Sequence, residues 1–364
     1  MQMLILSANT GGGHNATALA LSAQMKRLGI ACEIEDSLSF ISPRTSELIS
    51  RGHSYVYRRL PKLFGAGYRY EERHSVDFIY RRCAKGVEAL CERLARKPVD
   101  AVICTHVFSG LMMTELRRRH GGKIPCYFIA TDYTCSPGVS QIDAEGYFIP
   151  HPLLSDEFVE RGIAAEKLFA TGIPVGDAFY QRGDPRELKR RLGLPQDKRV
   201  ILLGCGSMGG GRLERVARML LRGLPDDVCL VVLCGTNQRA YELLRQYESD
   251  RFLPLPFIHN VWEYMGVADL YLTKPGGLTT SEAIAVGTPM ILVDAVPGCE
   301  TRNYHFLTAR GVACGAKGWR HANALAQAML PESERLGLLR QAMEQFGTHR
   351  SAERVCRILL EQIS

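Results

Sequence analysis

The chain has 364 residues, with 45 Lys and Arg against 38 Asp and Glu, so it carries a formal net charge of +7. Its 46% hydrophobic and 23% charged residues are typical of a folded globular protein and exclude a disordered chain, a collagen-like repeat and a coiled coil. No apolar run of about 20 residues occurs, so we expect no membrane-spanning helix, and the first residues predict no signal peptide.

The twelve cysteines predict a reduced, cytoplasmic protein. They form no CxxC pair and show no repeated spacing, and most lie in apolar runs such as 228–234. A thiol in such a run behaves as a small hydrophobic group. We therefore expect neither a disulfide framework nor a metal site.

Short β-branched runs alternate with helical stretches, the pattern of parallel sheets covered on both faces. In the first half we expect strands at 3–8, 30–35, 101–105, 126–131 and 146–149, with a helix at 16–28. In the second half we expect strands at 200–204, 228–234, 270–273 and 290–293, with helices at 213–221, 279–286, 322–329 and 334–363.

A Gly-x-Pro segment at 171–175, followed by a polar turn at 183–185, predicts a domain boundary, although a plain loop is the alternative. We expect α/β domains at 1–172 and 173–335. We also expect a C-terminal helix in 336–364 that packs back toward the first domain.

The first candidate site is a glycine loop between the strand at 3–8 and the helix that follows it. Gly12 and Gly13 allow the backbone to approach a ligand closely, and a helix N-terminus favours negative charge. His14 comes next, and an imidazole can accept a proton near neutral pH. A glycine turn with a capping His is the alternative interpretation.

The second candidate site, at 273–283, is more specific. A strand is followed by a glycine pair and a helix, so that unpaired backbone N–H groups and hydroxyls suit the oxygens of a diphosphate. Glu282 is placed to accept hydrogen bonds from a ribose diol, and Lys274 can offset phosphate charge. The residues assigned to this site are Lys274, Gly276, Gly277, Leu278, Thr279, Thr280 and Glu282.

Two further loops follow strands. Glu300 and Asn303 lie just past the strand at 290–293, where open α/β sheets bind ligands, and could hydrogen-bond sugar hydroxyls. Gly206 and Ser207 belong to a glycine-rich loop at 204–211 that offers backbone N–H groups. Four such loops, divided between two domains, predict a ligand-binding cleft between the domains.

The glycine–His loop and the string at 274–283 resemble the monogalactosyldiacylglycerol synthase and processive diacylglycerol glucosyltransferase group of glycosyltransferase family 28. The likeness extends through 104–106, 131–133, 171–175 and 297–300, in the same order along the chain.

This resemblance implies an α/β protein with the glycosyltransferase B fold, in which two Rossmann-like domains face each other across a cleft. It implies inverting transfer of a hexose from a UDP-sugar to a lipid acceptor, most simply diacylglycerol, with no cofactor and no bound metal. It assigns His14 as the base, or as a residue that positions the base. Asp36, just after the second strand, and Asp132 could orient His14 or bind the acceptor hydroxyl, and Asp132 is preferred because it lies in a string that matches the family. The resemblance also places Phe257 and Ile258 against the uracil through backbone contacts.

One residue departs from the family pattern. Family members usually carry Pro-Gly-Gln-Glu where this chain has Cys299 before Glu300. The family's Gln is expected to touch the donor sugar, and a thiol is a much weaker hydrogen-bonding group. The identity of the sugar therefore stays open. So do three other functions: a peptidoglycan-type N-acetylglucosaminyl transferase, a non-catalytic nucleotide-sugar-binding regulator, and a sugar-nucleotide epimerase on a similar fold.

The segment 51–97 contains twelve Lys and Arg against five acidic residues, a net charge equal to the +7 of the whole chain. Tyrosines and aliphatic residues lie among these cations, a combination that suits an anionic membrane surface. We assign Arg58, Arg59, Lys62 and Phe64 to this surface and place the protein peripherally on the inner face of the cell membrane. A solvated helix pair is the alternative, and no nucleic-acid-binding motif is present.

Overall fold

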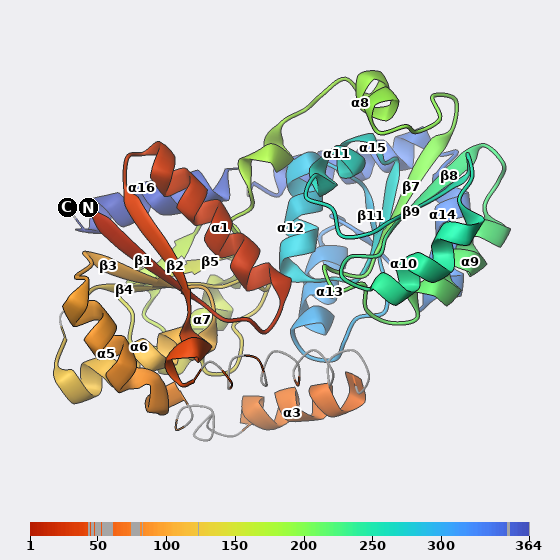
Figure 1. Ribbon diagram of the computed structural model, residues 1–364. Helices are drawn as coiled ribbons and strands as arrows, with labels where there is room; N and C mark the ends of the chain where they lie inside the picture. The colour runs from red at the N-terminus through yellow and green to blue at the C-terminus, as the bar shows by residue number, and fades with distance from the viewer. Residues whose placement is uncertain are drawn as a thin grey trace. The chain divides into compact units, whose positions relative to one another are not determined.

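The computed structural model describes every residue except 43, 45–46, 48–51, 53–60, 74–80, 82, 123, 348–349 and 364. It divides into two compact units, each built on one sheet (Figure 1). Unit 1 comprises Met1–Asp177, Val296–Cys299 and Thr348–Ser364, and unit 2 comprises Ala178–Ala295 and Glu300–Gly347. The domain boundaries expected after residues 172 and 335 stay predictions.

Unit 1 contains a six-stranded parallel sheet in the order β2-β1-β3-β4-β5-β6. Its strands are β1 (Gln2–Ser7), β2 (Ala31–Asp36), β3 (Ala101–Cys104), β4 (Cys126–Ile129), β5 (Gly146–Ile149) and β6 (Leu168–Ala170). Its α-helices are α1 (Gly12–Arg27), α3 (Pro61–Arg73), α5 (Val87–Arg96), α6 (Val107–His120), α7 (Ser155–Glu160) and α16 (Ser351–Ile363). Short 3₁₀ helices are η1 (Ser37–Phe40), η2 (Ala84–Gly86), η3 (Val139–Gln141), η4 (Pro152–Leu154) and η5 (Ala165–Lys167). A sixth, η6 (Asp177–Tyr180), contains the boundary between the two units.

The core of unit 1 forms because its central strands are continuous apolar runs that bury both faces. Leu21 and Met25 of α1 pack with Val355 of α16 against Ile5 and Ile103 of the sheet. Helix α16 is also bonded to the segment after β6, since Ser351 Oγ donates to the Ile173 carbonyl at 2.7 Å. The chain terminus thereby completes the first core.

Unit 2 contains a second six-stranded parallel sheet, in the order β12-β11-β10-β7-β8-β9. Its strands are β7 (Arg199–Gly204), β8 (Val228–Leu233), β9 (Phe252–Leu255), β10 (Leu270–Thr273), β11 (Met290–Leu292) and β12 (Cys314–Gly315). Its helices are α8 (Pro185–Arg191), α9 (Leu213–Gly223), α10 (Gln238–Leu244), η7 (Arg245–Tyr247), α11 (Val261–Val267), α12 (Gly277–Val286), α13 (Cys299–Ala309), α14 (Trp319–Met329) and α15 (Ser333–Gln345).

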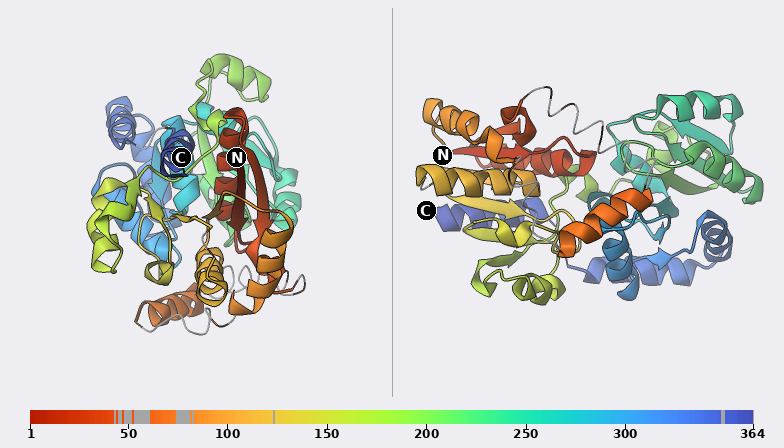
Figure 2. Two further views of the ribbon diagram at one scale, coloured as in Figure 1. Left: turned by 90° about the vertical axis from the view of Figure 1, so that its left-hand side faces the viewer. Right: turned by 90° about the horizontal axis from the view of Figure 1, so that it is seen from below.

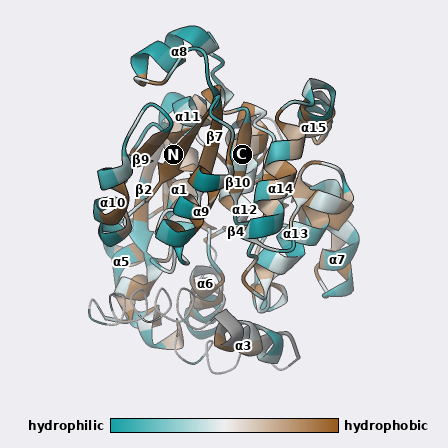
Figure 3. Ribbon diagram, turned by 90° about the vertical axis from the view of Figure 1, so that its right-hand side faces the viewer, coloured by the Kyte–Doolittle hydropathy of each residue, from teal (hydrophilic) through white to brown (hydrophobic). Residues whose placement is uncertain are grey.

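Helices lie on both faces of each sheet (Figure 2). The labelled strands of unit 2 are coloured as hydrophobic, whereas α8 is coloured mainly as hydrophilic (Figure 3). Within the described ranges, no helix has the length and apolar character needed to cross a bilayer. All twelve cysteines are free thiols.

Strand order creates a switch point in each sheet. In unit 1 the chain leaves β1 toward β2 on one side and later returns to β3 on the other side. In unit 2, β8 and β9 follow β7 on one side, and β10 pairs with its other side. Ligands of open α/β sheets bind outside the carboxyl ends of the strands at such points. The loops after β1 and β3, and those after β7 and β10, occupy these positions.

Two features differ from the sequence-based expectations. Three strands were not anticipated, β6, β9 and β12, and each is a short strand at the edge of its sheet. Strand β9 contains Pro254, which a sheet tolerates at an edge. The single helix expected at 334–363 is two helices, α15 and α16, because the chain turns at Gly347 and Arg350, both with positive φ.

Candidate functional site

His14 lies in the first turn of α1, at the switch point of unit 1. Its Nδ1 is 2.8 Å from the carbonyl oxygen of Thr105, which follows β3, and 3.1 Å from the hydroxyl of Thr131, which follows β4. A carbonyl only accepts hydrogen bonds, so Nδ1 carries the proton. In the neutral imidazole Nε2 then keeps its lone pair, which is the form a general base requires.

A second imidazole lies beside the first. The rings of His14 and His106 meet edge to face with their centroids 4.5 Å apart. His106 caps helix α6, and its Nδ1 accepts a hydrogen bond from the backbone N–H of Phe108 at 3.0 Å. His106 and Thr131 belong to the strings 104–106 and 131–133 that resemble the family, but the sequence predicted no role for either residue. The signal that could have found them is their position directly after predicted parallel strands.

The two aspartates considered near His14 have different surroundings. Asp36 accepts hydrogen bonds from the side chain of Asn9 at 2.9 Å and from the backbone N–H of Leu38 at 3.1 Å. It thereby holds the glycine loop against the end of β2. Asp132, the predicted partner of His14, is half-buried directly after Thr131. Its assigned role stays a prediction.

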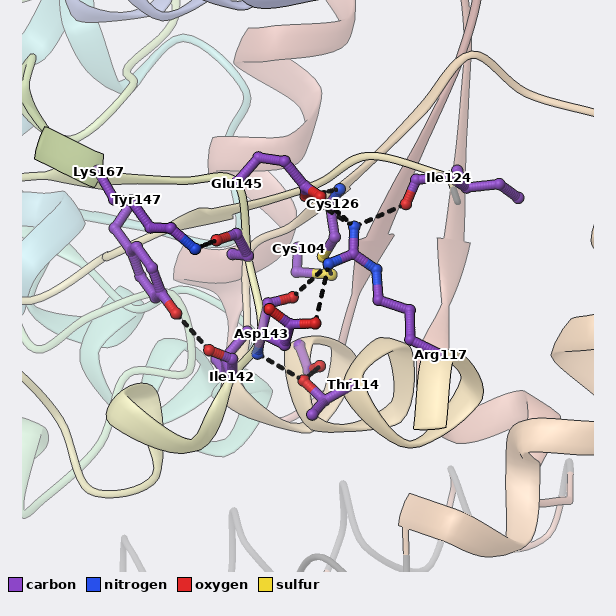
Figure 4. Close-up of polar contacts among 12 residues, drawn as sticks. Cys104, Thr114, Arg117, Ile124, Cys126, Ile142, Asp143, Glu145, Tyr147 and Lys167 are labelled. Carbon is purple, nitrogen blue, oxygen red and sulfur yellow. Dashed lines mark hydrogen bonds and ion pairs between the residues drawn. The ribbon is translucent and has the colours of Figure 1, made fainter. Parts of the chain in front are cut away.

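The connection that carries Thr131 and Asp132 is fixed at its far end by Arg117 of α6 (Figure 4). One guanidinium nitrogen, Nη2, lies 2.7 Å from both carboxylate oxygens of Glu145, and Nη1 lies 3.2 Å from Asp143 Oδ2. Glu145 in turn accepts the backbone N–H of Cys126, at the start of β4, at 2.6 Å. Both ends of the connection are therefore anchored to the sheet.

The turn after β10 lies at the switch point of unit 2. Helix α12 starts at Gly277, and its N-cap residue Gly276 has no side chain to satisfy the first N–H groups. Lys274 is buried, and its ammonium nitrogen lies 3.6 Å from a carboxylate oxygen of Asp294 after β11. An anion at this helix N-terminus would meet both the helix dipole and a cation already held in place.

The hydroxyl groups of the turn divide into two sets. Thr280 is fully buried, and its hydroxyl donates to the Gly276 carbonyl at 2.9 Å, while Ser281 donates to the Gly277 carbonyl at 2.8 Å. These two hydroxyls stabilise the helix start. Leu278 and Thr279 are half-buried in the first turn. We therefore place the anion-binding capacity in the backbone N–H groups of 277–279 and the Thr279 hydroxyl.

Glu282 follows one turn further along α12. Its side chain is half-buried, and the loss of hydration raises the pKa of the carboxyl group to about 8. A carboxyl group held in this way gains hydrogen bonds when a ligand brings hydroxyl donors to it. This environment fits the predicted ribose contact.

The loop after β7 reaches the same edge of the sheet. Gly206 and Ser207 are exposed, and Gly206 has a left-handed φ of +75°. The loop packs against the loop after β8, since the Ser207 carbonyl accepts the backbone N–H of Thr236 at 2.9 Å. A Cβ at Gly209 would lie 2.0 Å from the Cys234 carbonyl oxygen, so this contact needs glycine. In the loop after β9, Phe257 is 50% exposed and Ile258 is half-buried.

The segment after β11 contains the three remaining candidates. Cys299 is half-buried at the start of α13, and Glu300 is buried. Asn303 has no exposed surface, and its amide Nδ2 donates to the carbonyl of Pro275 at 2.9 Å. Asn303, one of the predicted sugar contacts, therefore makes a hydrogen bond to the turn that precedes α12.

Residues 14–175 match the family profile described as monogalactosyldiacylglycerol (MGDG) synthase, and residues 200–299 match the glycosyltransferase family 28 C-terminal domain. The chain belongs to glycosyltransferase family 28. A processive diacylglycerol beta-glucosyltransferase of Bacillus subtilis (strain 168) is 28% identical over 376 residues, covering 100% of this chain and 94% of that protein.

Two solved structures extend the family 28 comparison to the fold. The MurG protein of Acinetobacter baumannii has a TM-score of 0.64 and 18% identity, with 100% of both chains covered. The UDP-GlcNAc 2-epimerase of Neisseria meningitidis bound to UDP-GlcNAc has a TM-score of 0.66 and 12% identity, covering 99% of this chain and 100% of that one. With the two parallel sheets, they confirm the predicted glycosyltransferase B fold.

Cys299 is the position at which the sequence predicts a departure from the family pattern. The preceding residues, Val296–Cys299, cluster with unit 1 and contact α3. A Cβ at Gly65 of α3 would lie 2.3 Å from Pro297, and one at Gly298 would lie 3.0 Å from the ring of Tyr68. Helix α3 therefore packs closely on the loop that leads to Cys299.

The predicted membrane residues are only partly covered by the structure. Arg58 and Arg59 lie outside the described residues, as do the side chains of Lys62 and Phe64, although both positions belong to α3. On the same helix, Leu63 is 59% exposed and Tyr70 is 63% exposed. These two residues are seven positions apart, so they lie on one face of the helix.

Proposed function

We propose that this family 28 protein is an inverting glycosyltransferase that moves a hexose from a UDP-sugar to diacylglycerol and forms a β-glycosyl glycolipid. The observation that carries the proposal is the uncapped start of α12 beside the buried Lys274, at the switch point of unit 2. This is the arrangement that a nucleoside diphosphate requires. The full-length likeness to diacylglycerol glucosyltransferases supports the lipid acceptor.

The leaving group of the reaction is UDP, and its developing negative charge must be stabilised. The backbone N–H groups of 277–279 and the Lys274 ammonium group supply fixed positive charge for this step. Because these groups belong to the protein, the proposal needs no metal ion. The Glu282 carboxyl group binds the ribose hydroxyls and so orients the nucleotide.

The acceptor hydroxyl must lose its proton as it attacks the sugar. His14 takes this proton at Nε2, because the Thr105 carbonyl fixes the other ring nitrogen as the donor. Attack from the face opposite the departing UDP inverts the configuration at the anomeric carbon. Asp132 binds the acceptor hydroxyl or orients His14, and Glu300 binds hydroxyls of the donor sugar.

The lipid acceptor requires contact with a membrane surface. We assign this contact to the segment around α3, where Leu63 and Tyr70 are exposed and Arg58, Arg59 and Lys62 supply cations. The protein is then a peripheral enzyme on the inner face of the cell membrane. It takes its acceptor from the bilayer.

The proposal is tested by incubating the protein with vesicles containing diacylglycerol and with labelled UDP-glucose, UDP-galactose or UDP-N-acetylglucosamine. We expect UDP release and a β-hexosyl diacylglycerol product from one hexose donor, unaffected by a metal chelator. UDP-sugar binding without UDP release would instead support a non-catalytic regulator. Transfer of N-acetylglucosamine to another lipid would support a peptidoglycan-type transferase.

A further inference from the structure

Asn303 is the one fully buried amide side chain among the candidate donor-binding residues. It belongs to α13, whereas its partner, the Pro275 carbonyl, lies 28 positions earlier in the turn between β10 and α12. Its hydrogen bond therefore connects two elements of unit 2 at the carboxyl edge of the sheet. Its contact is directed at the protein backbone.

The turn that receives this hydrogen bond is held on its helix side, where the Thr280 hydroxyl donates to the Gly276 carbonyl at 2.9 Å. Within it, the Gly276 N–H donates to the Lys274 carbonyl at 2.9 Å. The N-cap residue Gly276 offers no side-chain cap, and a Cβ at this position would meet nothing within 4 Å. The φ of Pro275 is fixed, but the two glycines that follow it leave the turn conformational freedom that a support from outside the turn removes. The Asn303 amide is such a support.

We propose that Asn303 is a positioning residue that sets the orientation of the phosphate-binding N–H groups, and that it does not recognise the donor sugar. By holding the Pro275 carbonyl, it fixes the peptide planes on which the start of α12 depends. This inference rests on the proposed function, since it takes the start of α12 as the site of the diphosphate. It replaces the sugar contact that the sequence predicts for this residue.

The two roles predict different ligand dependence. A positioning residue for the phosphate site affects every ligand that carries a diphosphate and leaves the nucleoside unaffected. A sugar contact affects UDP-glucose and leaves UDP unaffected. Affinities for uridine, UDP and UDP-glucose therefore separate the two roles.

The experiment compares Asn303→Ala with Thr288→Val, a matched control in the same unit. Thr288 is also buried, and its hydroxyl donates to the Met265 carbonyl at 2.9 Å, after the other end of α12. Both variants lose one buried hydrogen bond to a backbone carbonyl, so they are matched in their general effect on stability. Asn303→Leu, which branches at the same carbon and fills more of the space, serves if the Ala variant does not fold.

We expect Asn303→Ala to weaken UDP and UDP-glucose binding together by about tenfold, the cost of one lost buried hydrogen bond, with uridine affinity unchanged. We expect Thr288→Val to change none of the three affinities. Weaker binding of UDP-glucose alone would overturn the proposal and restore the sugar contact. Equal effects of Asn303→Ala and Thr288→Val on UDP would overturn it as well.

A second measurement does not depend on nucleotide binding. Hydrogen exchange of the peptide covering 273–282 should be faster in Asn303→Ala than in Thr288→Val, because the turn loses its external support. Equal exchange in the two variants would overturn the positioning role. If the unsubstituted protein binds no UDP, the proposed function fails, and the exchange result still decides whether Asn303 holds the turn.

Discussion

The chemical properties of the candidate site residues depend on their hydrogen-bond partners and on their burial. The surroundings of His14 favour one tautomer, and those of Glu282 favour one protonation state. A backbone carbonyl fixes the tautomer of His14, and desolvation favours the neutral form of Glu282. Both effects follow from neighbours that are distant in sequence or packed around the side chain. The single-residue predictions concern these two groups.

Replacing His14 by Ala should lower kcat for transfer by at least about a hundredfold, the usual contribution of a general base. The dissociation constant of UDP should change less than about twofold, because the nucleotide-binding residues belong to the other sheet. Steady-state kinetics and calorimetry measure the two quantities. Thr131→Val, which removes only the hydroxyl 3.1 Å from Nδ1, should lower kcat much less. Normal turnover of His14→Ala would remove this residue from the mechanism.

Glu282 should make the stability of the protein depend on pH. Its pKa is about 8 in the folded chain against an ordinary value of 4.5, so the folded state binds more protons between these values. The free energy of unfolding should therefore fall as pH rises from about 5 to 8. Urea unfolding at several pH values measures this free energy, and its dependence on pH should be weaker for Glu282→Gln than for the unsubstituted protein. Parallel curves for the two proteins would contradict the raised pKa.

At the scale of elements, close contacts at glycine residues fix the position of a loop that leads to a candidate site residue. Helix α3 and the Pro297–Gly298 turn approach each other through Gly65 on one side and Gly298 on the other. The same helix exposes Leu63 and Tyr70. One helix thus exposes two apolar side chains and packs on the loop that leads to Cys299.

Two glycines of α3 provide a matched comparison. A Cβ at Gly65 would lie 2.3 Å from Pro297, whereas a Cβ at Gly67 would meet nothing within 4 Å. Gly67→Ala should stabilise the helix by up to about 1 kcal/mol, while Gly65→Ala should separate it from the loop. Tryptic cleavage after the exposed Arg69 should be slower in the first variant and faster in the second. Equal cleavage rates would contradict the close packing of α3.

At the scale of the whole molecule, charge is concentrated in one segment. Residues 51–97 carry a net charge equal to the +7 of the full chain, and this segment includes α3. Exposed apolar side chains on a helix within a basic segment favour an anionic membrane surface. The arrangement predicts salt-sensitive binding to lipid.

Substituting Leu63 and Tyr70 by Ser should reduce sedimentation with phosphatidylglycerol vesicles several-fold, because both apolar side chains leave the interface. Raising the salt concentration should weaken the binding of the unsubstituted protein. The control replaces Leu243 and Leu338, exposed apolar residues of unit 2, by Ser. Equal loss in both double variants, or no loss in either, would argue against α3 as the lipid contact.

The alternating α/β pattern and the loops that contain the candidate site residues could be predicted from the amino-acid sequence. These signals are local, since strand and helix periodicity and a Pro-Gly-Gly turn are readable within a short window. The edge strands β6, β9 and β12 were not predicted, because they are short and their hydrophobic pattern is weak.

Which of these loops lie side by side depends on the folded arrangement of the strands. Strand order brings Thr105 and Thr131 to His14 from 91 and 117 positions away, and it buries Asn303 against the turn at Pro275. Such contacts depend on how strands are ordered in a sheet, and the periodicity of a single segment carries no record of its neighbours. The sequence could therefore name the candidate residues, while folding of the whole chain assigned Thr280 to the helix start and Asn303 to the support of a turn.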